Sequence, residues 1–447
     1  MAASRETLEA QLNDFDPGTR RAALEVLADL AREGRIELPE PGRQVNMHCH
    51  TFFSFNGYGY SPSCLAWKAR CAGLAAAGVV DFDVLDAVDE FLDACRVLDL
   101  RGCAGIETRV YLEPFATREI NSPGEPGITY HMGAGFPTST AGDPVMADRL
   151  RQIARGRNLG MLERVNAHLA PLELDYDRDV TPLTPSGNAT ERHVCVAYDR
   201  KSQDMFPDDA ERARFWADKL GVDAAKVRST LDDPPVFHGL IRSKLMKAGG
   251  VGYVKPAGPD FPRLEEVNAF SLDAGAIPTL TWLDGFSEGE QAIDELLDVM
   301  LGAGAAALNI VPDRNWNIPD PELRAAKVAK LHEIVAIAES RGLPILVGTE
   351  MNAYGQRFVD DFDAPEMAPL VEPALNGAYL MYAHTMMQSR LGMGYLSSWA
   401  RTHFDSARNK NDFFVRLGKT LAPSHANALD RLGPEVAPEQ ILVEVSG

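Results

Sequence analysis

Seven short apolar segments alternate with helical stretches, and this alternation constrains the fold more than any other feature. The segments that we expect to be strands are 43–48, 78–83, 102–112, 128–133, 276–283, 305–311 and 343–349. Apolar residues at helical spacing mark the stretches between them, at 61–77, 84–98, 288–302 and 322–341. Alternation of this kind implies a mostly parallel sheet. The sequence therefore predicts an α/β fold, a distorted seven-stranded (β/α)7 barrel of the TIM type.

Further helical segments flank and interrupt this barrel. We expect an N-terminal helical arm, a first barrel half, a helical insertion, a second barrel half and a C-terminal helical extension, at 1–42, 43–136, 137–250, 251–360 and 361–447. The insertion is polar and lacks the alternation, so it would act as a lid. The extension would cover the barrel or form an oligomer contact.

Composition excludes several classes of function. The chain has 447 residues and a formal net charge of −20, and its lysines and arginines form no cluster. A nucleic-acid partner is not expected, because phosphate contacts along a polymer need a basic patch. A small phosphorylated substrate needs only a few local cations. The 6 cysteines form no CxxC pair, which favours a cytoplasmic protein with reduced thiols. No apolar segment is long enough for a membrane span.

Candidate metal ligands stand where the predicted strands end. His48 and His50 lie two residues apart, so in a strand both imidazoles would face one point. Such a pair is also found in ordinary half-buried strand ends. Other strand ends add four acids and a histidine, namely Asp81, Asp83, Glu107, His131 and Glu350. Because the carboxyl ends of barrel strands meet at one rim, we expect these side chains to converge on a metal centre.

The order of these motifs resembles the polymerase and histidinol phosphatase (PHP) family of metal-dependent phosphoesterases, in the subgroup with a helical insertion. His48-Cys49-His50 is similar to the family's opening His-x-His element, and Gly105-Ile106-Glu107 to its Gly-Ile-Glu element. Three further elements are similar to family motifs, Val80-Asp81-Phe82-Asp83, Tyr130-His131 and Thr190-Glu191-Arg192-His193. The resemblance covers residues 43 to 355 and rests on the order of the elements.

Three positions depart from the family pattern. Phe82 replaces one histidine, Trp282 or Leu283 replaces a second, and Asn352 replaces a third. In the family these histidines belong to the third metal site or lie beside it. The resemblance therefore implies two divalent metal ions, Zn, Fe or Mn, unless other residues rebuild the third site, for which His384 and Asp284 are candidates.

The resemblance also implies a role for each site residue. One ion would be held by His48, His50, Glu107 and Glu350, and the other by Glu107, His131 and His193. Glu107 would bridge the two ions, and Asp81 would bind the attacking water or orient a ligand. Substrate phosphate would be bound by Arg109, Lys255 and Arg314, although a surface salt bridge explains each of these cations equally well.

Three functions compete. The leading hypothesis is hydrolysis of a small phosphorylated metabolite, a phosphomonoester, by a hydroxide held on a binuclear metal centre. The first alternative is hydrolysis of a non-phosphate ester or amide on the same scaffold. The second is an inactive homologue that binds a metal or ligand, although retention of six candidate ligands argues against it.

Overall fold

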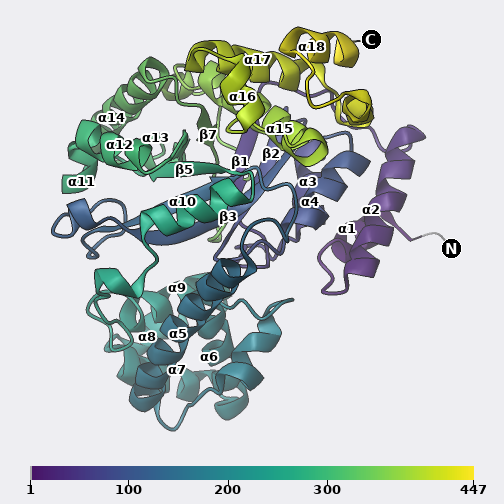
Figure 1. Cartoon of the computed structure of the whole chain (residues 1–447). Coiled ribbons are helices and arrows are strands. Elements are labelled where there is room, and N and C mark those ends of the chain that lie inside the picture. The colour runs from purple at the N-terminus through teal and green to yellow at the C-terminus, as the bar shows by residue number, and fades with distance from the viewer. Residues whose placement is uncertain (1–2, 447) are drawn as a thin grey trace.

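The computed structural model describes residues 3–446 and has a seven-stranded sheet at its centre (Figure 1). Strands that are neighbours in the sequence are also neighbours in the sheet. The strands are β1 Val45–Cys49, β2 Ala76–Phe82, β3 Gly102–Tyr111, β4 Ile128–Ala134, β5 Ile277–Trp282, β6 Ala307–Ile310 and β7 Ile345–Val347. The seven predicted strands are confirmed, with ends that differ by a few residues.

Backbone hydrogen bonds bring the first and last strands together. The amide of His50 donates to the carbonyl of Glu350 at 2.7 Å, and the amide of Glu350 donates to the carbonyl of His48 at 2.8 Å. Glu350 follows β7 and makes a parallel bridge to Cys49 of β1. The sheet is therefore a nearly closed barrel, with His48, His50 and Glu350 at one rim.

One strand breaks the predicted regularity. β4 runs antiparallel to both β3 and β5, whereas the other neighbouring strands are parallel. Between β3 and β4 the only helical element is the 3-10 turn Glu113–Phe115, so there is no crossover helix to reverse the chain. The barrel is mixed, and the carboxyl end of β4 lies at the rim opposite to that of its neighbours. The expected mostly parallel seven-stranded barrel is therefore present, but at this strand it departs from the (β/α)7 alternation of the TIM type.

Helices cover the outside of the barrel. They are α3 Pro62–Cys71, α4 Val88–Val97, α10 Leu264–Asp273, α11 Glu288–Gln291, α12 Ile293–Gly302, α13 Asp313–Trp316 and α14 Pro321–Ser340. Local capping sets several of their ends: the Ser61 hydroxyl accepts from the first turn of α3, and Asp320 caps α14 ahead of Pro321. The predicted helix 61–77 is shorter than expected, because Gly73, with a φ of 68°, follows its end and β2 starts at Ala76.

The N-terminal arm consists of α1 Arg5–Gln11 and α2 Pro17–Arg32. Helix α2 packs against α3 and α4. Its Arg20 is buried and donates from Nε to Glu90 of α4 at 2.9 Å. This contact fixes the arm to the first half of the barrel, where Phe15 and Arg20 also pack against the ring of Phe52.

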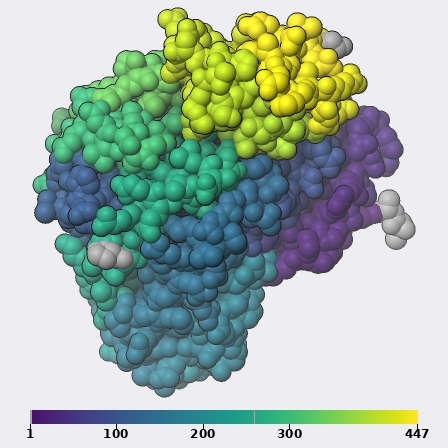
Figure 2. Space-filling model, viewed as in Figure 1, coloured from purple at the N-terminus to yellow at the C-terminus, as the bar shows by residue number. Residues whose placement is uncertain are grey.

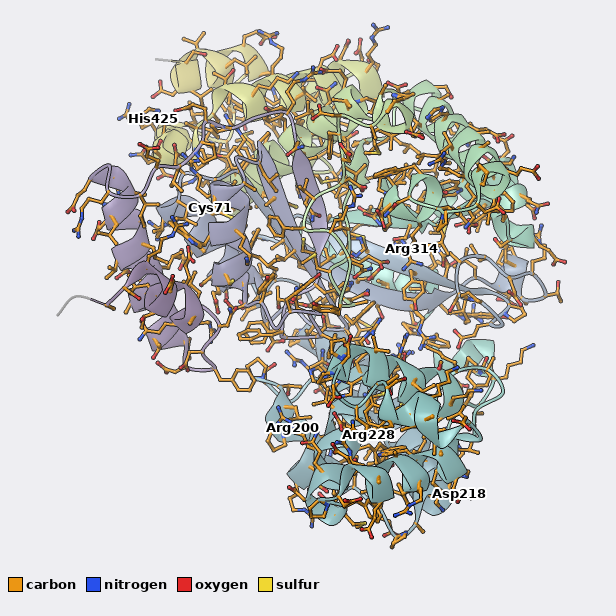
Figure 3. The ribbon with its side chains drawn as sticks, turned by 180° about the vertical axis from the view of Figure 1, so that it is seen from behind. Cys71, Arg200, Asp218, Arg228, Arg314 and His425 are labelled. Atoms are coloured by element: carbon orange, nitrogen blue, oxygen red, sulfur yellow. The ribbon has the colours of Figure 1, made fainter. Side chains whose placement is uncertain are left out.

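The insertion forms a separate lobe beneath the barrel (Figures 1 and 2). It contains α5 Pro144–Leu169, the turns Tyr176–Val180 and Thr181–Leu183, α6 Glu191–Met205, α7 Asp209–Leu220, α8 Ala224–Arg228 and α9 Pro234–Leu245. The start of α5 packs in the barrel core, whereas Met161 and the later apolar residues of α5 belong to a second core with Trp216 and Phe237. In Figure 3, Arg200, Asp218 and Arg228 lie in this lobe and Arg314 lies on the barrel.

The C-terminal segment contributes to the barrel wall. It contains the turns Pro365–Met367 and Pro423–Arg431, with α15 Val371–Leu391, α16 Ser398–His403, α17 Ala407–Thr420 and α18 Pro438–Ser446. Helix α15 packs directly on β1, β2, β3 and β7. Gly377 permits this approach, because a Cβ there would lie 1.9 Å from the carbonyl oxygen of Ile345. Residues 361–447 are thus more than a cover. None of the helices described between residues 3 and 446 combines the length and the apolar character needed to cross a membrane.

Candidate metal centre

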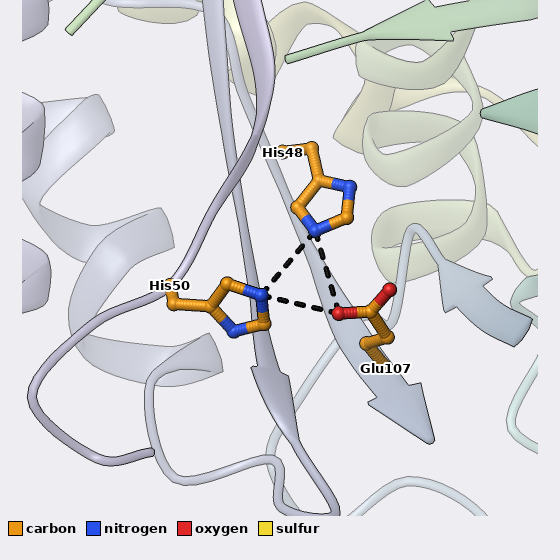
Figure 4. A group of neighbouring side chains, drawn as sticks. All are labelled: His48, His50 and Glu107. Carbon is orange, nitrogen blue, oxygen red and sulfur yellow. Dashed lines mark hydrogen bonds and ion pairs between the residues drawn. The ribbon is translucent and has the colours of Figure 1, made fainter. Parts of the chain in front are cut away.

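Three buried side chains converge inside the barrel. The Nε2 atoms of His48 and His50 lie 3.4 Å apart, and Oε2 of Glu107 lies 3.5 Å from the first and 3.1 Å from the second (Figure 4). The histidines come from the end of β1 and the loop that follows it, and Glu107 comes from β3. Within residues 3–446, this is the one group of three or more histidine, cysteine or acidic side chains whose ligand atoms meet closely enough to hold a metal ion.

The spacing of these atoms fits a metal ion. Metal–ligand bonds of about 2.1 Å at angles of about 90–110° separate neighbouring ligand atoms by about 3.0–3.4 Å. The three measured distances, 3.1, 3.4 and 3.5 Å, lie close to this range. Imidazole nitrogen and carboxylate oxygen are ligands that suit Zn, Fe and Mn. A divalent cation can therefore be held by His48, His50 and Glu107.

Neighbouring side chains leave both Nε2 atoms free to bind a cation. Nδ1 of His48 faces Oδ1 of Asn309, on β6, at 3.2 Å. Nδ1 of His50 faces Oγ of Ser54 at 3.3 Å, and that hydroxyl donates to Oδ1 of Asp81 at 2.5 Å. When both Nδ1 atoms donate, each Nε2 can present its lone pair to a cation. Without a cation, protons on the imidazoles join the Nε2 atoms to the carboxylate of Glu107.

Electrostatics within the group favours an ionised Glu107. Burial raises the pKa of its carboxyl, but the charge of His48 and hydrogen bonds from both imidazoles outweigh burial and lower the pKa to about 2. Burial lowers the pKa of His48, and the opposing charge of Glu107 raises it above its ordinary value. The carboxylate is thus charged at neutral pH, as a metal ligand must be.

Asp81 lies behind the group. It is adjacent to Phe82 in β2, so the two side chains point to opposite faces of the sheet. Besides the Ser54 hydroxyl, it accepts the amide of Thr51 at 2.7 Å and the hydroxyl of Thr51 at 2.6 Å. Of the two roles expected for Asp81, orienting a ligand matches this position. Phe82 faces the barrel interior and stacks on His50, with ring centroids 4.1 Å apart.

Glu350 and Arg314, expected as a metal ligand and a phosphate-binding residue, contact each other. Nη2 of Arg314 lies 2.7 Å from Oε2 of Glu350. The same oxygen accepts from Nε2 of Gln356 at 3.2 Å. Glu350 is close enough for its charge to raise the pKa of His48, yet it is not among the three converging ligands. Its backbone, with a φ of 64°, turns sharply after β7.

His131 is not brought to the metal group. In the antiparallel register His131 pairs with Thr108, and Glu107 pairs with Met132. His131 therefore points to the outer face, where its Nε2 lies 2.6 Å from Oδ1 of Asn268 on α10. The register of β4 is the reason: Met132 and Tyr130 share a face with Glu107 and Arg109, which leaves His131 on the other face.

Tyr130 takes the inward position next to His131. It pairs with Arg109 across β3 and β4, on the face that carries Glu107. Burial raises the pKa of its hydroxyl, and the charges of Arg109, Glu107 and Glu350 all act on it. Tyr130 thus lies between the metal group and the arginines. The sequence held no signal for it, because the register between β3 and β4 decides which of two neighbouring residues faces inward.

His193 lies at the start of α6, on the insertion. Its Nδ1 accepts from the amide of Thr190 at 3.0 Å, and its ring packs edge-on against Phe55 with centroids 5.0 Å apart. Burial lowers its pKa to about 3, so the imidazole is neutral. Nearby, the side-chain amide of Asn188 donates to the carbonyls of Phe53 and Phe82 at 3.2 and 2.9 Å. The loop that carries His193 is thereby held over the metal group, although His193 is not one of the three converging ligands.

The predicted phosphate-binding cations differ in position. Arg109 is half-buried, and its Nη1 lies 2.6 Å from Oε2 of Glu125. Arg314 is exposed over 44% of its side chain and pairs with Glu350. Lys255 is exposed on the segment that leaves the insertion. Sequence reasoning missed Arg157 of α5, which approaches Asp83 at 3.4 Å. No local motif could have identified it.

Two residues that replace family histidines, Trp282 and Asn352, and the two candidates for a rebuilt third site, His384 and Asp284, each make other contacts. Trp282 is in register with Ile310, one position away from the inward-facing Asn309, so its ring lies outside the barrel. His384 of α15 accepts the amide of Tyr395 at 2.9 Å, and Asp284 pairs with Lys327 at 2.8 Å. Nδ2 of Asn352 lies 3.5 Å from the carboxylate of Glu350.

Comparison with known proteins gives distant matches only. No family model matches the chain, and no curated protein matches it. An amidohydrolase from Chromobacterium violaceum, solved with sulfate and without metal, has a TM-score of 0.47 and 16% sequence identity, over 74% of this chain and 96% of its own. A protein described as a candidate metal-dependent phosphoesterase, from Bifidobacterium adolescentis, has a TM-score of 0.44 and 20% identity, over 71% and 90%. Both likenesses are too weak to assign a family or an activity, so the PHP resemblance stays a prediction.

Proposed function

We propose that the chain is a metal-dependent hydrolase that removes the phosphoryl group from a small phosphorylated molecule. The observation that carries this proposal is the convergence of three ligand atoms, from His48, His50 and Glu107, on one point inside a barrel. Imidazole nitrogen and carboxylate oxygen are ligands for divalent cations, and all three side chains are buried.

The metal ion would activate water, and the side chains around it hold the ion and orient its ligands. When bound, a divalent ion supplies Lewis acidity and lowers the pKa of a water molecule. His48, His50 and Glu107 hold the ion. Asn309 and the Ser54–Asp81 pair fix the orientation of the two imidazoles, and the Phe82 ring keeps water from one face of His50. Because the ligands are already held in orientation, metal binding costs less conformational entropy.

Local positive charge supports a phosphorylated substrate. The chain as a whole carries a formal charge of −20, yet Arg109 and Arg157 lie on the side of the barrel where Tyr130 faces inward, and Arg314 lies beside Glu350. Guanidinium groups bind phosphate oxygens in a bidentate manner. The insertion loop, anchored through Asn188, limits the space above the metal group and favours a compact substrate over a polymer.

We propose a centre built on the three-ligand group rather than the binuclear centre implied by family resemblance. His131 lies on the outer face, so the second ion would lose that ligand. Glu350 would have to leave Arg314 before it could bind an ion. The hydrolysis of an ester or amide without phosphate is the second candidate, and it is favoured by the same loss of the second set of ligands.

A substrate panel separates these functions. The full-length protein, reconstituted with Mn, Zn or Fe, is assayed against phosphorylated metabolites and against carboxylic esters and amides. We expect release of inorganic phosphate that His50→Ala abolishes, and that His425→Ala, a surface change on the 3-10 segment Pro423–Arg431, leaves unchanged. Turnover of esters or amides alone would replace phosphate hydrolysis with the second candidate. No turnover of any class with metal bound would reject both.

A further inference from the structure

An arginine of the insertion reaches the mouth of the barrel. Arg157 is on α5, and its guanidinium lies 5.1 Å from the ring centroid of Phe261. The guanidinium of Arg109, on β3, lies 4.7 Å from the same ring. One cation from the insertion and one from the barrel therefore share a buried aromatic side chain across the seam between the two lobes.

The carboxylates around this pair leave Arg157 incompletely compensated. Glu125 contacts Arg109 at 2.6 Å. Asp83 lies 3.4 Å from Nη2 of Arg157 through one oxygen, while its other oxygen accepts the hydroxyl of Thr108 at 2.6 Å. Arg157 is thus held by a single long contact. Burial and the nearby positive charge of Arg109 lower the pKa of Arg157 and outweigh the opposing charges of Asp83 and Glu125.

Arg109 is on the same side of the sheet as the metal group, and the charges of Arg109 and Tyr130 both act on Arg157. Arg109 follows Glu107 by two residues in β3, so both side chains point into the barrel. Tyr130, opposite Arg109, is close enough to both Glu107 and Arg109 for each charge to act on its pKa. A phosphate group between the arginines would therefore lie next to the reacting end of the site.

We propose that Arg157 and Arg109 together form a binding site for a phosphate-type oxyanion, and that the insertion is part of the substrate site. This inference rests on the proposed function, because the oxyanion is the phosphate group of the substrate. Two guanidinium groups match a doubly charged phosphomonoester better than a neutral amide or ester. The bound anion neutralises the like charges and ties α5 to β3, so substrate binding strengthens the contact between insertion and barrel.

Sulfate binding tests this site without catalysis. The full-length protein is titrated with inorganic sulfate by calorimetry, with and without added metal. We expect saturable binding to the wild type, and an affinity about tenfold weaker in Arg157→Gln and in Arg109→Gln. Arg157→Lys keeps the positive charge but loses the planar guanidinium group, so its sulfate affinity should lie between those of the wild type and Arg157→Gln. Arg155→Gln is the matched control, because Arg155 is on the same helix and pairs with Asp177 instead.

The outcomes separate this inference from the proposed function. Sulfate binding that depends on Arg157, in a protein that hydrolyses no phosphate ester, supports the anion site and rejects the reaction. Phosphate hydrolysis with equal sulfate affinity and equal KM in the wild type and Arg157→Gln supports the reaction and rejects the anion site. Absence of sulfate binding to the wild type also rejects the anion site. Melting curves of each variant show that a lost affinity does not reflect unfolding.

Discussion

The carboxylate of Asp81 is connected to the imidazole of His50 through a single hydroxyl group. Oγ of Ser54 lies 2.5 Å from Oδ1 of Asp81 and 3.3 Å from Nδ1 of His50. The amide and hydroxyl of Thr51 occupy the rest of the carboxylate. Asp81 acts on the loop that carries His50, so it is a positioning residue of the metal group.

Substitution Asp81→Asn is therefore expected to weaken metal binding. An amide in place of the carboxylate presents an N–H group to at least one of three donors, which releases the loop after β1. Loss of such a partner lowers metal affinity about 10- to 100-fold. Calorimetric titration with Zn or Mn measures the effect, with the exposed Asp93→Asn as control. Unchanged affinity with lost turnover would instead assign Asp81 a direct role in the reaction.

Substitution Glu350→Gln separates the sequence-based assignment from the observed geometry. The family resemblance makes Glu350 a ligand, which predicts loss of metal. In the structure its carboxylate contacts Arg314 and Gln356, so we expect metal content equal to that of the wild type. Elemental analysis decides between them. Depletion as complete as in Glu107→Gln would mean that Glu350 leaves Arg314 when metal binds.

A buried acid outside the site makes stability depend on pH. Asp360 accepts from the indole of Trp316 at 3.0 Å, and its other oxygen has no partner within residues 3–446. Burial raises its pKa from 3.8 to about 7. Between about pH 4 and pH 7 the folded state binds one more proton than the unfolded state, so stability falls as pH rises, by at most about 1.4 kcal/mol per pH unit.

Substitution Asp360→Asn replaces the titrating carboxyl group with an amide that binds no proton in this pH range. Relative to the wild type, the variant should gain stability as pH rises from 5 to 7 and keep a constant difference at pH 8. Urea unfolding at pH 5, 6, 7 and 8 measures the difference, with the exposed neighbour Asp361→Asn as the control. A gap between Asp360→Asn and wild type that stays the same at all four pH values would show that Asp360 is ionised throughout.

Local sequence was sufficient for the ligands that come from β1 and β3, the strands on either side of β2. His48 and His50 share one strand end, and the parallel partner of Phe82 in β3 is Glu107. Strand alternation alone therefore brings these positions to one rim. Their convergence was predictable because it needs no information beyond strand order, while their role as metal ligands stays a prediction.

The features of the site that the sequence did not predict depend on contacts between segments that are distant in the sequence. The direction of β4 follows from the short connection after β3, and its register with β3 places His131 outside and Tyr130 inside. The contact between Asn309 and His48 joins residues that are 261 positions apart in the sequence. Arg157 reaches Phe261 only because the whole insertion folds back on the barrel. None of these relationships has a local signature in the sequence.

Metal content, measured by elemental analysis, tests the central claim most directly. The full-length protein is purified without chelator, reconstituted with Zn, Fe or Mn, and compared with Glu107→Gln and with the exposed control Glu113→Gln. We expect about one ion per chain in the wild type and the control, and less than about a tenth of that in Glu107→Gln. A wild-type protein that stays free of metal, or a Glu107→Gln variant that keeps its full content, would contradict the account.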